Sequence, residues 1–311
     1  MVTIDRRAIP DAATESHWQA EDGWSIRRID WRADVPKGSI LFLPGRGDIY
    51  EKYLETLHGF WTNGWNVTAS DWRGQAGSGR FSEEPNVGHV DDFATWIADL
   101  AWFWKIWAAQ TPGPHILMGH SMGGHLVLRA LAERAVDPDA AILSAPMLGI
   151  HAGGVPYWVG HSYARLMTRI GNPARAAWKD SEKPGSRASE RHKLLTHDKA
   201  RYDDEPGWWA LRPELKMGPA SWGWVERAMD SIRGLERTGT LEAIDTPMLI
   251  VATTADQLVD TRRIITDAKR LPNAELVLYG DEAAHELLRE ADPVRDQVMA
   301  TIGAFLERQT Q

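Results

Sequence analysis

A short apolar run that passes through Gly-His-Ser-Met-Gly into an amphipathic stretch constrains the fold of this chain most. Residues 115–119 have the length and apolarity of a buried strand, and residues 122–135 have the spacing of a helix. The two patterns almost touch, so the chain must turn sharply at Ser121. Side chains at Gly119 or Gly123 would collide with such a turn, which explains both glycines. The pattern therefore predicts a strained strand–turn–helix unit that holds a serine hydroxyl above a sheet.

Strand and helix patterns alternate towards both ends of the chain. Buried-strand patterns also occupy 39–43, 66–72, 140–144, 247–253 and 274–279, with a half-buried strand at 24–32. Helical spacing occupies 49–63, 91–109, 261–271 and 293–308. This order predicts an α/β fold, with a mostly parallel central sheet covered by helices on both faces.

The middle of the chain breaks this alternation. From 147 to 240 no buried strand pattern occurs, and the segment is rich in Gly, Pro, Trp and basic residues. We interpret 147–240 as a mainly helical cap inserted into one core, which then consists of residues 1–146 and 241–311. The insertion would lie over the edge of the sheet.

Composition excludes several classes of protein. The sequence has no cysteine, so disulfides, thiolate metal sites and a cysteine nucleophile are excluded. The formal net charge of −8 argues against a nucleic-acid partner. No stretch approaches the roughly 20 apolar residues of a membrane span, and residues 1–19 lack the apolar run of a signal peptide. We therefore expect a cytoplasmic protein, with peripheral contact at the inner membrane left open.

A serine hydroxyl needs a base to become a nucleophile, and the base needs an orienting carboxylate. His285 follows the last strand pattern, which would bring it to the same sheet edge as Ser121. Asp256 follows the strand pattern at 247–253 and is the predicted carboxylate. Asp260 competes with it, but its position before Thr261 is typical of a helix cap.

An acyl-transfer site also needs donors for an oxyanion. The Met122 N–H lies at the start of the helix after Ser121, where the helix dipole favours negative charge. The second predicted donor is the Arg46 N–H, between Gly45 and Gly47 in the loop after the early strand; an ordinary glycine turn is the alternative reading of this loop. His120 is expected to point away from the hydroxyl and to support the packing.

These residues together resemble the lysophospholipase and monoacylglycerol-lipase group of α/β-hydrolases, also described as serine aminopeptidase-like. The matching pieces are Pro44–Gly47, Asp71–Gln75 with Gly77–Arg80, Gly119–Gly124, Asp256 with its neighbours, and Ala284–Glu286. Pro44 stands where monoacylglycerol lipases usually carry His, and Thr254-Ala255 stands where a Gly is common. The resemblance implies the α/β-hydrolase fold and an acyl-enzyme mechanism without metal or organic cofactor.

The resemblance implies an acyl ester or a lysolipid as the small-molecule substrate. Residues 161–201 hold ten Lys and Arg against four Asp and Glu, and several tryptophans lie nearby. Such a cap favours contact with an anionic lipid surface, or it is a solvated cap with an aromatic inner face. A general esterase, an acyltransferase, an aminopeptidase that holds an ammonium group on Asp203–Glu205, and a non-catalytic binding protein remain alternatives.

Overall fold

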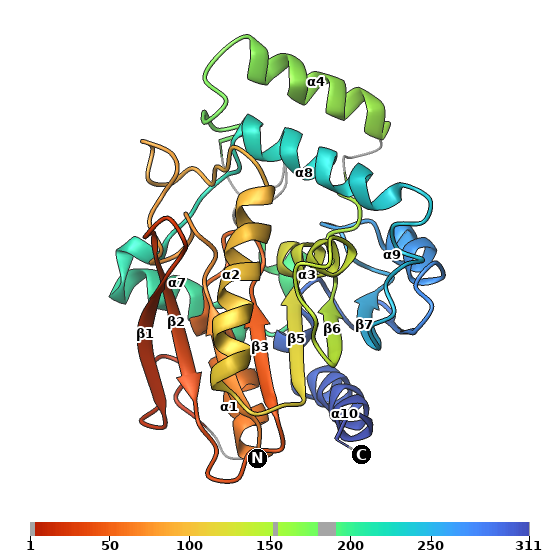
Figure 1. The fold of residues 1–311 in the computed structure, drawn as a ribbon. Helices are drawn as coiled ribbons and strands as arrows, with labels where there is room; N and C mark the ends of the chain where they lie inside the picture. The colour runs from red at the N-terminus through yellow and green to blue at the C-terminus, as the bar shows by residue number, and fades with distance from the viewer. Residues whose placement is uncertain (1–3, 152–154, 180–190, 311) are drawn as a thin grey trace.

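The computed structural model describes residues 4–151, 155–179 and 191–310. At its centre is an eight-stranded sheet in the order β1-β2-β4-β3-β5-β6-β7-β8 (Figure 1). The pairs β1·β2 and β2·β4 are antiparallel, and every other neighbouring pair is parallel. The predicted mostly parallel sheet of an α/β fold is therefore confirmed. Its strands are β1 (Ala13–Gln19), β2 (Ser25–Trp31), β3 (Ser39–Leu43), β4 (Asn66–Ser70), β5 (His115–His120), β6 (Ala140–Ser144), β7 (Met248–Thr253) and β8 (Ala274–Tyr279).

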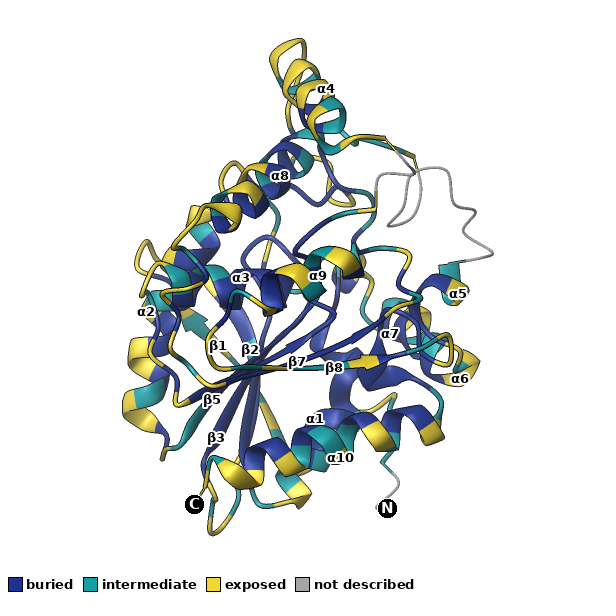
Figure 2. Cartoon of the chain, turned by 90° about the vertical axis from the view of Figure 1, so that its right-hand side faces the viewer, coloured by how far each residue is buried: buried dark blue, intermediate teal, exposed yellow. Residues whose placement is uncertain are grey.

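Helices cover both faces of this sheet, as Figure 2 shows. Alternate side chains of a buried strand point to opposite faces, and each face has its own apolar cluster. Leu41 and Leu117 belong to one cluster, and Phe42 and Met118 to the other. The first face carries α2 (Ala94–Gln110), α3 (Met122–Ala132) and α9 (Thr261–Ala268), and the second carries α1 (Leu54–Thr62) and α10 (Asp292–Arg308).

Helices α3 and α9 each end three residues earlier than predicted and β4 ends two residues earlier, and three other elements differ from the sequence-based expectation for a physical reason. Strand β1 was not predicted, because as an edge strand it alternates between half-buried and exposed residues with no apolar run. The helix predicted from residue 91 begins at Ala94, since the Asp92 carboxylate accepts the Ala94 N–H and ends the preceding loop. The helix predicted over 49–63 is divided into a 3₁₀ turn η1 (Tyr50–Tyr53) and α1.

The described part of residues 147–240 contains helices and isolated bridges but no strand. Helix α8 packs on the α2 and α3 face through Trp224, Ala228 and Ile232, and α4 lies on top of α8 (Figure 1). Residues 180–190 of the predicted basic segment lie outside the described residues. The helices here are α4 (Tyr157–Arg169), α5 (Arg191–Leu195), α6 (Lys199–Tyr202), α7 (Asp204–Leu211) and α8 (Trp222–Glu236), with a 3₁₀ turn η3 (Pro213–Leu215) between the last two; a further 3₁₀ turn, η4 (Leu287–Arg289), precedes α10.

Within the described ranges, every helix is too short or too polar to cross a lipid bilayer.

Candidate active site

The turn between β5 and α3 places Ser121 in a strained backbone conformation, with φ of 52° and ψ of −116°. A non-glycine residue with positive φ is uncommon, so surrounding contacts must hold it there. The Ser121 N–H donates to the Ser144 carbonyl at 2.9 Å. The Ser121 carbonyl accepts from the N–H groups of His125 and Met147, each at 3.0 Å. The neighbouring strand and helix therefore fix the serine from both sides.

The two glycines of the motif allow close packing of backbone on backbone. A Cβ atom at Gly119 would lie 2.6 Å from backbone atoms of Gly123 and Gly124. A Cβ atom at Gly123 would overlap the carbonyl groups of Leu43 and Pro44. Backbone cannot yield to such contacts as a flexible side chain does. Helix α3 is thus packed directly against the end of β3, and larger residues are excluded at both positions.

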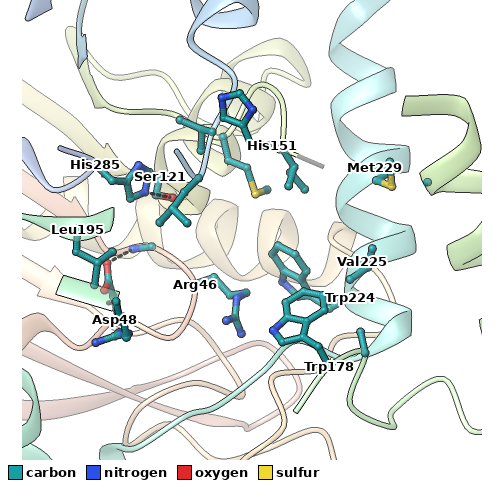
Figure 3. A pocket seen from close by; sticks show the side chains of 18 of the residues that line it. Arg46, Asp48, Ser121, His151, Trp178, Leu195, Trp224, Val225, Met229 and His285 are labelled. Carbon is teal, nitrogen blue, oxygen red and sulfur yellow. Dashed lines mark hydrogen bonds between the residues drawn. The ribbon is translucent and has the colours of Figure 1, made fainter. Parts of the chain in front are cut away.

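The structure brings together the three residues of the predicted catalytic set. His285 Nε2 lies 2.9 Å from Ser121 Oγ, and His285 Nδ1 lies 2.7 Å from Asp256 Oδ2 (Figure 3 shows Ser121 and His285). Ser121 follows β5, Asp256 follows β7, and His285 lies in the loop after β8. All three therefore stand at the carboxyl edge of the parallel strands, where open α/β sheets place their ligands.

Asp256, and not Asp260, is the carboxylate that contacts the imidazole of His285. The second oxygen of Asp256, Oδ1, accepts the N–H groups of Leu258 and Val259 at 2.8 and 3.0 Å, which fixes the carboxylate plane. Asp260 instead accepts the Arg262 N–H at 3.0 Å as the N-cap of α9, as its sequence position indicated.

Asp256 and His285 shift each other's protonation. Burial alone would raise the pKa of Asp256, but the charge of His285 and the hydrogen bonds to the carboxylate lower this pKa below its ordinary value. Burial alone would lower the pKa of His285, but the Asp256 carboxylate outweighs it and raises this pKa above 6.5. The pair therefore favours an imidazole that accepts a proton readily and is stabilised once it is charged.

The loop after β3 runs directly beside the serine. A Cβ atom at Gly45 would lie 3.1 Å from the Ser121 Cβ. The Gly45 N–H donates to Asp48 Oδ2 at 3.1 Å, and the Gly47 N–H donates to Gln75 Oε1 at 2.7 Å, so the loop has a fixed shape. Arg46 follows Gly45 in this loop, and Met122 begins α3 directly after Ser121. Their roles as oxyanion donors remain a prediction.

Sequence analysis missed a group of buried charged residues behind the histidine. Asp48, Lys52 and Glu286 are each less than a tenth exposed, and they contact one another. Their sequence signal was weak: a lysine four residues after an aspartate, in a stretch whose apolar positions predicted an amphipathic helix. Such a pair is usually solvated, and local spacing gave no sign that all four residues of η1 are buried.

His120 lies beside the predicted base. Its ring centroid is 4.9 Å from that of His285, and its Nε2 is 4.0 Å from Asp48 Oδ2. Burial, and next the charge of His285, lower the pKa of His120 to about 4. His120 is therefore neutral near pH 7 and supports the packing around the base, in the role expected from its position before Ser121.

A cavity of about 510 Å³ opens at Ser121 and is mostly apolar. Its far side is formed by Trp178 and by Trp224, Val225 and Met229 of α8 (Figure 3). Arg46 enters it from the β3 loop, where its guanidinium lies 5.5 Å from the Trp224 ring centroid and donates to the Gly218 carbonyl. Ligand cavities of this size hold molecules with an extended apolar part.

Two other features bear on the chemistry of the site. Among the described residues, no group of three or more His, Asp and Glu side chains is arranged to hold a metal ion.

The acidic run Asp203–Glu205 forms ion pairs with cationic side chains: Asp204 accepts from Arg6 at 2.7 Å, and Glu205 lies 3.1 Å from Lys52. This run is therefore a poor receptor for the ammonium group of a peptide.

Known proteins resemble this chain along most of its length. The family model described as serine aminopeptidase, S33, matches residues 34–292. Lysophospholipase L2 of Escherichia coli K12 is 28% identical over 309 residues, which cover 94% of this chain and 87% of that protein.

Solved structures resemble it as well. A soluble variant of monoglyceride lipase from Saccharomyces cerevisiae has a TM-score of 0.77 at 19% identity, covering 98% of this chain and 97% of that one. A carboxyl esterase from Bacillus coagulans has a TM-score of 0.73 at 16% identity, covering 97% and 100%. These likenesses confirm the predicted α/β-hydrolase fold.

The pKa of His285 should lie above the ordinary value of a histidine, and the pKa of His120 should lie below it. In an NMR titration of ring-labelled histidine, we expect a pKa above 6.5 for His285 and of about 4 for His120. Asp256→Asn should lower the pKa of His285, because the carboxylate charge stabilises its protonated form. Asp260→Asn, which removes a nearby carboxylate without contact to the ring, is the matched control. An unchanged His285 titration in Asp256→Asn would contradict this coupling.

Proposed function

The chain belongs to the serine aminopeptidase S33 family of α/β-hydrolases, and on that premise we propose that Ser121, His285 and Asp256 are its catalytic residues. Its relatives make it a serine ester hydrolase of the lysophospholipase and monoglyceride lipase group, as the sequence motifs predicted. The observation that supports the assignment of residues is the pair of contacts from His285, at 2.9 Å to Ser121 and 2.7 Å to Asp256.

The first step follows from these contacts. Ser121 Oγ attacks the carbonyl carbon of an ester while His285 Nε2 takes its proton. The C=O bond becomes C–O⁻, and the Met122 and Arg46 N–H groups are the proposed donors to this oxyanion. Asp256 holds the ring orientation and stabilises the imidazolium. When the tetrahedral adduct collapses, the imidazolium protonates the leaving alcohol and the acyl group stays on Ser121.

The second step reverses these roles with water. His285, neutral again, takes a proton from a water molecule that attacks the acyl carbon. The new tetrahedral adduct expels Ser121 Oγ, which regains its proton from the imidazolium. A carboxylic acid is released, and the enzyme returns to its starting state. Every proton in both steps passes through Nε2, which the Asp256 contact at Nδ1 keeps directed at the serine.

We propose further that the acyl group of the substrate is a fatty chain and that the substrate is a lysophospholipid or a monoacylglycerol. The cavity at Ser121 is mostly apolar, and its residues on α8 and Trp178 stand across from the hydroxyl. An apolar wall adds binding free energy with each methylene that it covers. The engaged acidic run at Asp203–Glu205 weighs against an aminopeptidase.

Removal of the serine hydroxyl tests the catalytic assignment. We expect Ser121→Ala to fold normally and to lower kcat by about 10⁴-fold or more, because nothing else forms the acyl-enzyme. A fluorophosphonate probe should label the wild type and leave Ser121→Ala unlabelled. Ser39→Ala is the control: this buried serine lies at the far end of β3, where its hydroxyl donates to the Pro112 carbonyl. Labelling of Ser121→Ala would refute the assignment.

Chain length tests the fatty-acyl proposal. With p-nitrophenyl esters, kcat/KM should rise roughly fourfold per added methylene until the cavity is full, which corresponds to ~0.8 kcal/mol each. Val225→Trp should shorten the preferred chain, because Val225 lines the cavity. Val35→Trp, at a position 85% exposed, should leave the profile unchanged. Lysophosphatidylcholine and monoacylglycerol are assayed alongside, and activity restricted to acetate and butyrate esters would exclude a fatty chain.

The outer face of α4 supports a third proposal, contact with an anionic lipid surface. Helix α4 buries His161 and Ala164 but exposes Trp158 and Leu166, which are 72% and 51% accessible. The exposed apolar and aromatic residues of this face are Trp158, Tyr163, Leu166 and Ile170, with Ser162, Arg165 and Arg169 also exposed there. Apolar and aromatic residues bordered by arginines suit the headgroup region of an anionic membrane. The face adjoins the cavity, since Val159 and Tyr163 of α4 also line it.

Vesicle sedimentation tests this proposal. We expect the protein to bind phosphatidylglycerol vesicles more tightly than phosphatidylcholine vesicles, and less tightly at high salt. Trp158→Ser and Leu166→Ser should each weaken binding by about tenfold or more, because each removes a large apolar group from the contact. Leu211→Ser, which alters a leucine on α7 that is 63% exposed, is the control. Equal binding of all variants would show that α4 is not the contact.

A further inference from the structure

We propose that Lys52 is a positioning residue for ester hydrolysis: its buried ammonium ties the loop that carries Arg46 to the loop that carries His285. The inference rests on the function proposed above and concerns a residue outside the catalytic set. Lys52 belongs to the group of buried charged residues behind His285. Each contact of the ammonium leads to a different part of the fold.

Three carboxylates surround Lys52 Nζ. The distances are 2.5 Å to Asp48 Oδ1, 2.7 Å to Glu286 Oε1 and 3.1 Å to Glu205 Oε1. The lysine side chain is 1% exposed. An ammonium group has three N–H donors, and two of them form hydrogen bonds here, to Asp48 and Glu286. The contact with Glu205 is an ion pair without hydrogen-bond geometry. All three partners belong to the protein, although Lys52 borders the cavity at Ser121.

The first contact leads to the β3 loop. Asp48 accepts from Lys52 through Oδ1, while its Oδ2 accepts from the Gly45 N–H at 3.1 Å and from the Tyr53 hydroxyl at 2.8 Å. Gly45 directly precedes Arg46 and approaches Ser121 closely. The lysine therefore fixes the carboxylate that shapes the backbone around the proposed oxyanion donor.

The second contact leads to the histidine. Glu286 follows His285 in the chain, and its Oε2 accepts from the Arg289 guanidinium. The Glu286 N–H donates to the Leu195 carbonyl at 2.7 Å. A carboxylate held by two cations and a backbone held by α5 leave the His285 loop little freedom. The Lys52 ammonium thus connects the loop of His285, through Glu286, to the β3 loop, through Asp48.

The third contact leads to residues 147–240. Glu205 lies on α7, and its second oxygen accepts from the Arg191 guanidinium of α5. Helix α5 also reaches the base directly, since the Leu194 carbonyl accepts the His285 N–H at 3.4 Å. Helix α5 therefore contacts the histidine loop directly, and α7 is joined to it through Lys52.

The electrostatics make the cation necessary. Asp256, Glu286 and Asp48 are the acidic groups near His285, and His120 is the nearest base. Buried carboxylates without a cation repel each other and are costly to desolvate. If Lys52 were neutral, Asp48 would lose its ammonium partner and Glu286 would keep Arg289 alone, so the two carboxylates would move apart or take up protons. Either change displaces a loop beside the reacting atoms, and a displacement of about 1 Å is enough to cost roughly 10²-fold in rate.

The test compares Lys52→Met, which keeps length without charge, with Lys52→Arg, which keeps the charge. We expect Lys52→Met to lower kcat for a p-nitrophenyl ester by about 10²-fold with KM within about threefold of wild type. The rate of fluorophosphonate labelling should fall similarly, because it depends on the same hydroxyl and imidazole. Lys52→Arg should recover at least about tenfold of the lost kcat. A residue that binds substrate would raise KM instead.

Arg73→Met is the matched control for the loss of a buried cation. Arg73 pairs with Asp99 at 2.6 Å and with Asp22, away from Ser121. We expect it to lower the unfolding midpoint while kcat stays within about threefold of wild type. If Lys52→Met fails to fold, Glu286→Gln replaces it: the weaker contact to Lys52 should lower kcat at least tenfold with KM unchanged.

Two results would overturn the positioning role: a folded Lys52→Met enzyme whose kcat matches that of Arg73→Met, or a lowered kcat that Lys52→Arg does not restore. Neither result would contradict the assignment of Ser121, His285 and Asp256 as catalytic residues. That assignment fails separately, if Ser121→Ala keeps its activity or its fluorophosphonate labelling.

Discussion

The site depends on backbone packing around one strained residue. Ser121 holds a positive φ because β6 and α3 bind its N–H and carbonyl, and because glycines let α3 touch the end of β3. The same packing brings Gly45, which precedes Arg46, close to the Ser121 side chain. Strain of this kind costs about 1–3 kcal/mol and persists only where its surroundings enforce it. The tight turn therefore brings the half-buried Ser121 hydroxyl, the β3 loop and the first residue of α3 together at one edge of the sheet.

The parallel sheet supplies the other groups. Strands β3, β5, β7 and β8 all end at the same edge, so the loops after them meet although they are up to about 240 residues apart in the chain. The common edge alone would still let each loop move far enough to break the hydrogen bonds between Ser121, His285 and Asp256. Direct contacts remove that freedom: backbone N–H groups hold Asp256, Gln75 holds Gly47, and α5 holds the loop of His285. The sheet gives approximate positions, and these polar contacts refine them.

Local pattern was enough to predict the parallel core and the grouping of Ser121, His285 and Asp256, because each follows an apolar run that predicts a buried strand. Asp260 was separated from Asp256 by its helix-cap position, which α9 bears out. Strand β1 was missed because half of an edge strand faces solvent and pairing with β2 is its main support. The buried charges around Lys52 were missed because the three carboxylates near its ammonium group, Asp48, Glu205 and Glu286, are far apart in the sequence. Contacts between residues so far apart in the chain produce no periodic pattern in any short stretch of the sequence.

The contacts of residues 147–240 divide this segment by role. Helix α8 packs with α2 and α3 and lines the cavity, while α4 rests on α8 and turns an apolar face outward. Helices α5 to α7 instead join the other core: Trp208 packs in the cluster of α1 and α10, and Arg201 bonds to Glu55 and Asp292. Any displacement of α5 to α7 would have to break the ion pairs of Arg201 and the contacts of Leu194 and Leu195 with the loop of His285. Helices α5 to α7 therefore support the loop of His285, while α4 and α8 form the wall of the cavity.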